Sequence, residues 1–157
     1  GIARVKGWHY RSALVAALSF GKPYRRYDLS GSDVSNSWLT KDEELVLRYY
    51  TEPRCSLTFT LNGYLGLFEA VADSCNQNNA NRIPKELPIL LVSGADDPVG
   101  DFGEGVRRVF RMYEEAGIKD VKLQLYEGDR HEILNELDRE MIFDEIEEWL
   151  EEHNTRE

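Results

Sequence analysis

The sequence has few cysteines and no long apolar run. Cys55 and Cys75 lie in unrelated contexts without a C-x-x-C spacing, which favours neither a zinc site nor a disulfide framework. We expect both to be reduced, buried thiols of a cytoplasmic protein. No signal peptide is visible, and the longest apolar stretch, residues 87–92, is far too short to span a bilayer. The sequence therefore predicts no transmembrane segment.

The sequence also lacks an excess of positive charge, with 19 basic against 29 acidic residues. The formal net charge of the 157 residues is −10, and residues 132–157 alone contain eleven acidic and two basic side chains. Such a concentration of acidic residues is typical of a solvated helix face. We therefore expect no nucleic-acid partner, because this surface would repel a phosphate backbone.

A change of pattern near Ile83 divides the chain into two regions. A length of 157 residues suffices for one compact domain or for part of a larger one. Before residue 83 the sequence predicts helices joined by polar loops, and the Asn-rich segment 75–81 has no apolar periodicity, which favours a connector. We predict a helical region over residues 1–82 and an α/β region over residues 83–157.

Three helices are predicted in the helical region. Residues 11–20 carry apolar side chains on one face. Thr40 and Glu43 form a capping-box pattern that would start a second helix, and Pro53 would end it. Apolar residues recur at helical spacing over residues 61–71. Three short helices cannot form much of a core alone, so they need a sheet to pack against.

Strands and helices alternate in the second region. Residues 89–92 are consecutively apolar, as in a parallel strand covered on both faces. Residues 106–113 form an amphipathic pattern that stops at Gly117, residues 121–126 alternate as a strand does, and residues 142–150 predict the last helix. This order predicts a parallel sheet with a right-handed crossover. Two strands are too few for a stable sheet, so we expect further strands before residue 1.

An acid and a histidine follow the two predicted strands. Asp97 comes after residues 89–92, and His131 comes after residues 121–126. Functional groups of open α/β sheets lie beyond the carboxyl ends of the strands, so we expect the two side chains to meet. A carboxylate on one imidazole N–H orients the ring, while the other ring nitrogen takes a proton from a nucleophile. The alternative is that Asp97 caps the turn before Pro98 and that His131 is merely exposed.

Two segments resemble a known family. Residues 93–100 (SGADDPVG) and 128–136 (GDRHEILNE) together look like the C-terminal half of an α/β-hydrolase, in the capped monoacylglycerol lipase and lysophospholipase group of serine hydrolases. In that family the acid follows a glycine by three residues, which selects Asp97 over Asp96. The histidine lies in a Gly-x-x-His turn, which selects His131. Residues 18–21 and 38–44 also resemble the helical cap of bacterial members.

The nucleophile motif of that family is missing. No G-x-S-x-G sequence occurs; Ser30, Ser32 and Ser35 lie in a polar loop, and Ser93 lies inside a predicted strand. In the family the serine and the oxyanion-hole amides precede the cap, so the resemblance implies a nucleophilic serine upstream of Gly1. The expected fold is therefore the C-terminal part of an α/β-hydrolase: a cap or lid over residues 1–82 and an incomplete sheet over residues 83–157.

The resemblance implies a function for the complete parent protein. We expect a carboxylic-ester hydrolase that cleaves a lipid-like ester, such as a monoacylglycerol or a lysophospholipid, through an acyl-enzyme and without a metal or organic cofactor. Asp97 would orient His131, and the upstream half of the same protein would be the partner that completes the site. The isolated chain would be inactive. The alternative is a non-catalytic α/β binding or interaction module.

Other polar groups have simpler interpretations. Asp96 and Asp97 together could also suggest the magnesium pocket of a phosphoryl-accepting receiver domain, but Pro98 and His131 argue against it. Asp129 lies in a tight turn and favours a loop role.

His9 and His153 lack partners at ligand spacing and favour surface positions. The glycines at 100, 103 and 105 do not have phosphate-loop spacing, so we expect them to form a flexible helix entry.

Aromatic side chains are frequent in the helical region. In a lid they would bury an acyl chain, but aromatics at helical spacing are more often core. We expect Tyr64 and Phe68 to be core and leave Phe59 open. The aromatic residues of the helical region that could have either role include Trp8, Phe20, Trp38, Phe59, Tyr64 and Phe68.

Overall fold

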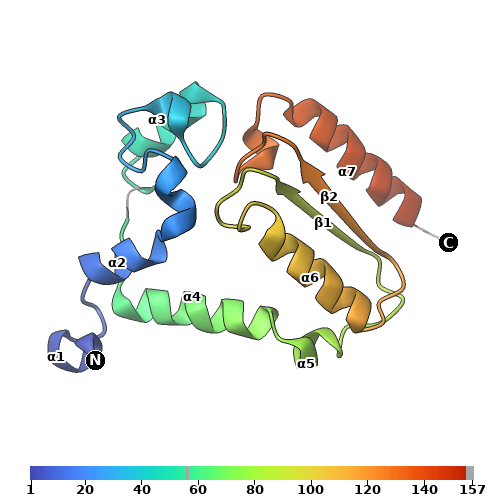
Figure 1. Cartoon of the computed structure of the whole chain (residues 1–157), viewed down its shortest axis with the longest axis horizontal. Helices are drawn as coiled ribbons and strands as arrows, with labels where there is room; N and C mark the ends of the chain where they lie inside the picture. Colours follow the sequence, from blue (N-terminus) through green and yellow to red (C-terminus); the bar gives the residue numbers. More distant parts are fainter. Residues whose placement is uncertain (56, 155–157) are drawn as a thin grey trace.

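The computed structural model describes residues 1–55 and 57–154 and contains a two-stranded parallel sheet between two helices (Figure 1). The elements are α1 (Ile2–Lys6), α2 (Ala13–Ser19), the 3-10 helices η1 (Lys22–Arg26) and η2 (Val34–Asn36), α3 (Glu43–Thr51), α4 (Leu61–Ser74), α5 (Gln77–Ala80), β1 (Ile89–Gly94), α6 (Glu104–Glu115), β2 (Val121–Tyr126), η3 (Ile133–Asn135) and α7 (Arg139–His153).

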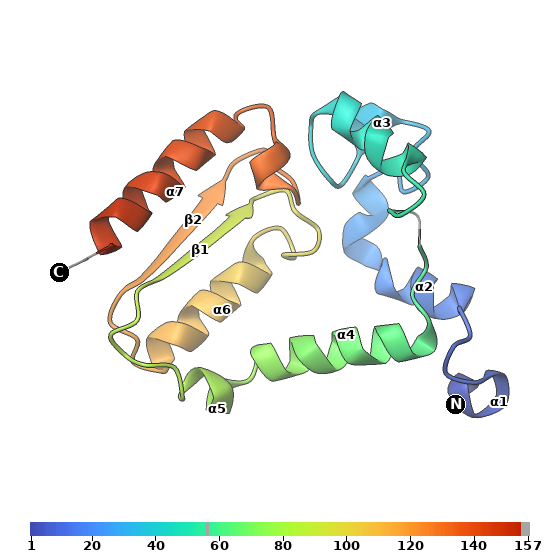
Figure 2. The same cartoon turned by 180° about the vertical axis from the view of Figure 1, so that it is seen from behind.

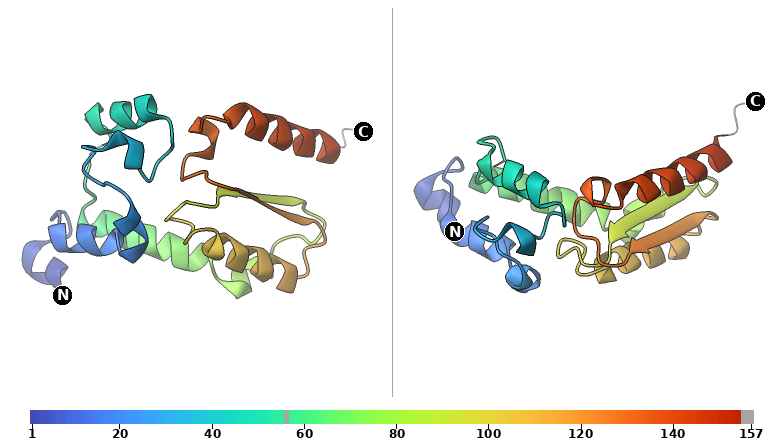
Figure 3. Two further views of the ribbon diagram at one scale, coloured as in Figure 1. Left: turned by 45° about the horizontal axis from the view of Figure 1, so that its top comes forward. Right: turned by 90° about the horizontal axis from the view of Figure 1, so that it is seen from above.

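The sheet has the predicted parallel pairing. β1 and β2 run in register from Ile89 opposite Val121 to Gly94 opposite Tyr126. Helices α6 and α7 cover opposite faces of the sheet (Figure 3). Because the strands are parallel, their carboxyl ends and the turns that follow them lie at one edge. That edge faces the helical region (Figures 1 and 3).

Side-chain caps start the helices of the first region. The Ser12 hydroxyl accepts a hydrogen bond from the Val15 amide (3.3 Å) at the start of α2, and the Thr60 hydroxyl accepts one from the Gly63 amide (3.1 Å) at the start of α4. Each hydroxyl satisfies one amide that has no partner within its helix. Helix α4 runs from beside α2 to α5 and so connects the helical region to the sheet (Figure 2). The predicted helices over residues 11–20 and 61–71 are thereby confirmed.

The core is small. Ala80, Ala116 and Ile118 are buried together, and Ile89 and Met112 are among the partly buried side chains that pack against them. The residues of β1 from Ile89 to Ser93 are only half-buried, although consecutive apolar residues predicted a strand covered on both faces. With two strands among the described residues, β1 has a single neighbour. None of the helices among the described residues is long and apolar enough to cross a membrane.

Both cysteines differ from expectation. Cys55 and Cys75 are free thiols, but both are exposed rather than buried. Cys55 follows the last turn of α3, and Cys75 is the C-cap of α4. Cysteine is often buried, but here both lie in polar segments beside helix ends, and the polar composition of the surrounding sequence was a better guide than the residue type.

The predicted capping box at Thr40 is wrong. Helix α3 is capped two residues later by Asp42, whose Oδ1 accepts hydrogen bonds from the amides of Glu44 (3.1 Å) and Leu45 (3.2 Å). Thr40 is fully buried, and its hydroxyl lies 2.9 Å from the Asn135 carbonyl and 3.0 Å from a Glu136 carboxylate oxygen. A long-range contact therefore uses the hydroxyl that the local pattern assigned to the helix.

One further local expectation needs correction. The Asn-rich connector contains the one-turn helix α5, because the Asn76 side chain caps it by accepting a hydrogen bond from the Asn78 amide (2.8 Å).

The glycines expected at a helix entry lie at the start of α6, and the flexibility expected there stays a prediction. Gly103 has φ +83°, and a Cβ there would lie 2.8 Å from Leu125, while one on Gly105 would lie 2.8 Å from the Gly100 carbonyl oxygen.

Candidate active site

Asp97 lies in the turn that follows β1 and is 5% exposed. Its Oδ1 accepts a hydrogen bond from the Val99 amide (2.8 Å), and its carbonyl oxygen accepts one from the Phe102 amide (2.9 Å). These local bonds fix the carboxylate while Oδ2 remains available on its other side. The turn thus holds a buried acid in one orientation.

His131 lies in the turn that follows β2. The Asp129 carbonyl oxygen in this turn accepts a hydrogen bond from the Asp96 amide (2.8 Å), which joins the turn to the one after β1. The His131 amide donates to the Trp38 carbonyl oxygen (3.3 Å), and the Glu132 amide donates to that of Leu39 (2.7 Å). The histidine backbone is therefore held by both the sheet edge and the helical region.

The two predicted side chains meet. His131 Nδ1 lies 3.1 Å from Asp97 Oδ2, as expected from the positions of both residues after parallel strands. The hydrogen bond to Asp97 raises the pKa of the His131 imidazole above its usual value, and this effect outweighs burial, which acts in the opposite direction. The alternative of an Asp97 that only caps its turn does not describe this arrangement, because one oxygen bonds the turn and the other bonds the histidine.

Steric packing explains why residue 94, three residues before Asp97, is a glycine. A Cβ on this residue would lie 2.2 Å from the Arg130 carbonyl oxygen and 2.3 Å from that of Asp129. Both contacts are with backbone, which cannot move aside as a flexible side chain would. The close approach of the two turns, which brings Asp97 and His131 together, therefore requires glycine at the end of β1.

The helical region contacts both turns. The Trp38 ring packs on the His131 imidazole with the ring centroids 5.1 Å apart and the planes tilted by 37°. The Tyr27 hydroxyl donates to the Asp96 carbonyl oxygen (2.7 Å). Pattern analysis missed Tyr27, because its role depends on one long-range hydrogen bond and leaves no periodic signal.

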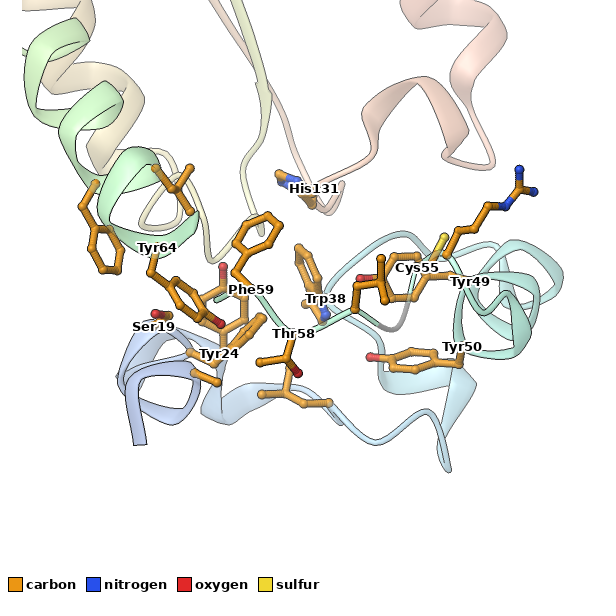
Figure 4. Close-up of a pocket in the computed structure, with 17 residues that line it drawn as sticks. Ser19, Tyr24, Trp38, Tyr49, Tyr50, Cys55, Thr58, Phe59, Tyr64 and His131 are labelled. Atoms are coloured by element: carbon orange, nitrogen blue, oxygen red, sulfur yellow. The ribbon is translucent and has the colours of Figure 1, made fainter. Parts of the chain in front are cut away.

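A cavity of about 900 Å³ extends from His131 into the helical region. Figure 4 shows His131 on the sheet side, while the other labelled residues come from the helical region. Its volume is within the range of small-molecule sites, which are mostly apolar with a few polar groups. Its lining consists mainly of aromatic and aliphatic side chains: Phe20, Tyr24, Leu29, Trp38, Tyr49, Tyr50, Leu57, Phe59, Tyr64, Leu67, Phe68 and His131 among others.

The aromatic residues considered from sequence divide between cavity and surface. Phe20, Trp38, Phe59, Tyr64 and Phe68 line the cavity. Trp8, by contrast, is exposed and does not line the cavity. Tyr64 is buried as expected, but Phe68 is 50% exposed, so its assignment to the core is wrong.

Three residues that line the cavity were not predicted from the sequence: Tyr24, Tyr49 and Tyr50. The three tyrosines lie in η1 and near the end of α3, where no regular spacing marks the inward side.

The other candidate groups occupy different places. Asp129 is fully buried and forms an ion pair with Lys41, and burial raises the pKa of its carboxyl group while Lys41 acts against that rise. His9 is exposed. His153 is only partly exposed and has partners, since its ring nitrogens lie 2.6 Å from the Trp149 carbonyl oxygen and 2.8 Å from Asp120.

The four serines weighed as nucleophiles have hydrogen-bond partners other than His131. Ser30 and Ser32 bond the Asp28 carboxylate, Ser35 bonds Asp33, and the Ser93 hydroxyl lies 3.3 Å from the Gly94 carbonyl oxygen. Across residues 1–55 and 57–154 there is no group of three or more His, Cys, Asp or Glu side chains that could hold a metal ion.

Solved structures show the same fold. A lipase in its open form has a TM-score of 0.79 at 24% identity, and the match covers 92% of this chain and 46% of that one. A highly thermostable carboxyl esterase from Bacillus coagulans has a TM-score of 0.68 at 28% identity and coverages of 95% and 47%. A soluble variant of monoglyceride lipase from Saccharomyces cerevisiae has a TM-score of 0.63 at 22% identity and coverages of 90% and 48%.

The chain spans about half the length of these structures. Their names, together with the sheet, its crossover helix and the polar turns at the strand ends, identify the fold as a partial α/β-hydrolase fold. A family model described as serine aminopeptidase, S33, matches residues 3–138, which is most of the sequence. The chain therefore belongs to this family of α/β-hydrolases.

Proposed function

We propose that this chain supplies the acid and the base of a serine hydrolase that cleaves lipid-like carboxylic esters, of the monoacylglycerol or lysophospholipid type. The observation that carries the proposal is the 3.1 Å contact between Asp97 Oδ2 and His131 Nδ1 at the mouth of an apolar cavity. A buried carboxylate fixes the tautomer of the imidazole and stabilises its protonated form. Nε2, on the other side of the ring, then serves as the site of proton transfer.

The reaction has two steps. In the first, His131 takes the proton of a serine hydroxyl as that oxygen attacks the ester carbonyl, and then gives the proton to the leaving alcohol. In the second, it takes a proton from the water that attacks the acyl-enzyme carbonyl, and returns that proton to the serine oxygen as the ester bond breaks and the carboxylic acid leaves. Asp97 holds the ring and stabilises its protonated form in both steps. No metal or organic cofactor enters this scheme.

The nucleophile belongs to the part of the parent protein that precedes Gly1. The chain spans 46–48% of the lengths of three matched hydrolases and has no G-x-S-x-G sequence. The oxyanion-hole amides belong to the same upstream part. We propose residues 1–82 as the cap or lid and residues 83–157 as the C-terminal part of the core, in a cytoplasmic protein.

The lining of the cavity favours a substrate with an apolar chain. Most of its described residues are aromatic or aliphatic, and apart from His131 the one charged side chain among them is that of Arg54. Aromatic and aliphatic walls suit an acyl chain. The monoglyceride lipase among the matched structures agrees with this substrate class.

Labelling of the intact parent with a fluorophosphonate probe tests the proposal. We expect a single labelled serine and a large loss of labelling in His131→Ala, because the hydroxyl is then no longer activated. His9→Ala, which changes an exposed histidine, is the matched control and should label normally. Absence of labelling, or labelling indifferent to His131→Ala, would favour the non-catalytic binding module. Parallel assays with a monoacylglycerol, a lysophospholipid and an aminoacyl anilide separate the substrate classes.

A further inference from the structure

We propose that Glu136 is a positioning residue for His131, holding the histidine turn against residues 37–41 of the helical region. This inference rests on the proposed role of His131 as the general base. Glu136 is not among the described residues that line the cavity, and its side-chain hydrogen bonds are with Thr40, Lys41 and Arg130. It acts through the backbone of two segments that face each other, residues 37–41 of the helical region and residues 130–136 after β2. We call the contact between these two segments the seam.

The Glu136 carboxylate joins two segments that are far apart in sequence. The side chain is fully buried. Oε1 accepts a hydrogen bond from the Arg130 amide (2.8 Å), directly before His131, and Oε2 accepts one from the Lys41 amide (2.9 Å). The Thr40 hydroxyl lies 3.0 Å from Oε2 and can donate its one hydrogen there or to the Asn135 carbonyl oxygen. One carboxylate therefore connects the histidine turn with the segment that carries Trp38.

Other bonds along the same seam converge on this segment. The Arg130 guanidinium donates from Nη1 to the carbonyl oxygens of Ser37 (2.6 Å) and Thr40 (3.2 Å). The backbone bonds from His131 and Glu132 to Trp38 and Leu39 lie between these contacts. Glu136 is the charged acceptor among them, and hydrogen bonds to charged groups are stronger than those to neutral ones.

The seam sets the position of the imidazole in two ways. It places the Trp38 ring against one side of His131, and it fixes the backbone from which the ring reaches Asp97. If residues 130–131 shift, the Nδ1 contact lengthens and Nε2 moves relative to the substrate. A displacement of about 1 Å at a reacting group can lower the rate about 100-fold.

Glu136→Gln is the informative change because it keeps the shape of the side chain. Each carboxylate oxygen accepts from a backbone N–H, so an amide must turn its NH₂ group towards one of these donors. The variant therefore loses the hydrogen bond to either the Arg130 or the Lys41 amide, and at that position the side-chain NH₂ group faces a backbone N–H. Glu132→Gln is the matched control: it removes the same charge from a half-buried neighbour of His131 whose charge acts directly on the His131 pKa. Glu136 is not among the groups whose charge shifts that pKa.

The test uses the complete parent protein and two measurements. NMR titration of the His131 ring, assigned with His131→Gln, should show a high pKa in the unmodified protein and a clear fall towards 6.5 in Glu136→Gln. The fall in Glu132→Gln should be smaller. In ester hydrolysis kcat should fall about 100-fold in Glu136→Gln, with the acid limb of the pH profile moved to lower pH and KM little changed.

Each outcome decides the proposal. A folded Glu136→Gln protein whose His131 pKa equals the unmodified value, or shifts no more than that of Glu132→Gln, overturns it. If Glu136→Gln does not fold, Glu136→Asp keeps the charge but is one methylene shorter, so it cannot reach both the Arg130 and the Lys41 amides and should also lower the pKa of His131. An unchanged pKa in that variant overturns the proposal as well. Because the titration needs no turnover, it remains decisive even if fluorophosphonate labelling excludes the hydrolase.

Discussion

Gly94 has the strictest steric requirement at the site. Gly94→Ala would force a Cβ to within 2.2 Å of a backbone carbonyl oxygen, so one of the two turns must shift. We expect a loss of about 3 kcal/mol in the free energy of unfolding, at the upper end for overpacking, measured by urea denaturation of the parent protein.

Gly66→Ala is the matched control for this prediction. Gly66 lies within α4, and nothing lies within 4 Å of an added Cβ. Alanine in a helix interior should raise stability by about 0.5–1 kcal/mol. Equal effects of the two substitutions would contradict the steric explanation.

Asp97→Asn tests the acid through the pH dependence. The Asp97 bond raises the pKa of His131, so the folded state favours the protonated ring; that stabilisation is present below about pH 6.5 and disappears as the pH rises through the folded pKa. Catalysis needs the neutral imidazole, so the acid limb of kcat/KM should lie above pH 6.5.

In Asp97→Asn we expect this limb to move to lower pH and kcat to fall by about four orders of magnitude. Asp96→Asn is the matched control, because Asp96 contacts the site through its backbone amide and carbonyl. A limb that stays in place in Asp97→Asn would show that another group orients the ring.

Helix α3 shows how an element can begin at a residue other than the one its local pattern indicates. Asp42→Ala removes the acceptor of two amide hydrogen bonds and should lower the stability by about 1 kcal/mol. Asp42→Asn keeps a capping oxygen while removing the charge that faces Arg139 at 3.7 Å. If both variants lose the same stability in thermal unfolding, the ion pair and not the cap is responsible.

The link between α3 and the histidine turn also depends on Lys41. Its ammonium pairs with the fully buried Asp129 carboxylate, one oxygen of which has no hydrogen-bond partner among the described residues. Lys41→Met would leave a buried charge unpaired and should cost about 3 kcal/mol. Adding Asp129→Asn to Lys41→Met should restore most of the lost stability, because the buried carboxylate charge is then absent.

The pH dependence of the Lys41→Met deficit gives an independent check. Burial raises the folded pKa of Asp129, so the penalty should be absent below the unfolded pKa of about 3.9 and should grow as the pH rises through the folded value. Urea denaturation of both proteins between pH 4 and pH 7 measures this difference. A deficit independent of pH would point to lost packing of the lysine stem instead.

For the whole molecule, the proposal of a missing nucleophile predicts an inert fragment. The 157-residue chain, purified alone, should show no turnover of ester substrates, while the parent protein should hydrolyse them. Mixing the chain with a separately expressed upstream part is expected to restore activity if the two parts associate. Turnover by the chain alone that Asp97→Ala abolishes would contradict the fragment interpretation.

Sequence patterns were most reliable where structure depends on neighbours along the chain. The strand predicted over residues 89–92 from its apolar run is β1, and apolar periodicity indicated β2 and helices α4, α6 and α7. The alternation of strands and helices indicated the parallel pairing. Patterns were wrong at Thr40, Phe68 and both cysteines, because burial there depends on distant segments. No periodicity indicates that a threonine hydroxyl will meet Asn135 and Glu136.

The sequence by itself determined which carboxylate and which imidazole meet beyond the strand ends, and that no G-x-S-x-G sequence occurs, because these depend on residue type and on position after a strand. It also determined the family, since the two motifs lie at fixed offsets from Gly94 and Gly128. Only the tertiary structure decided that the helical region holds both turns and that its aromatic residues line a cavity beside His131. These features are contacts between segments up to about a hundred residues apart, and such contacts depend on packing that local sequence does not encode.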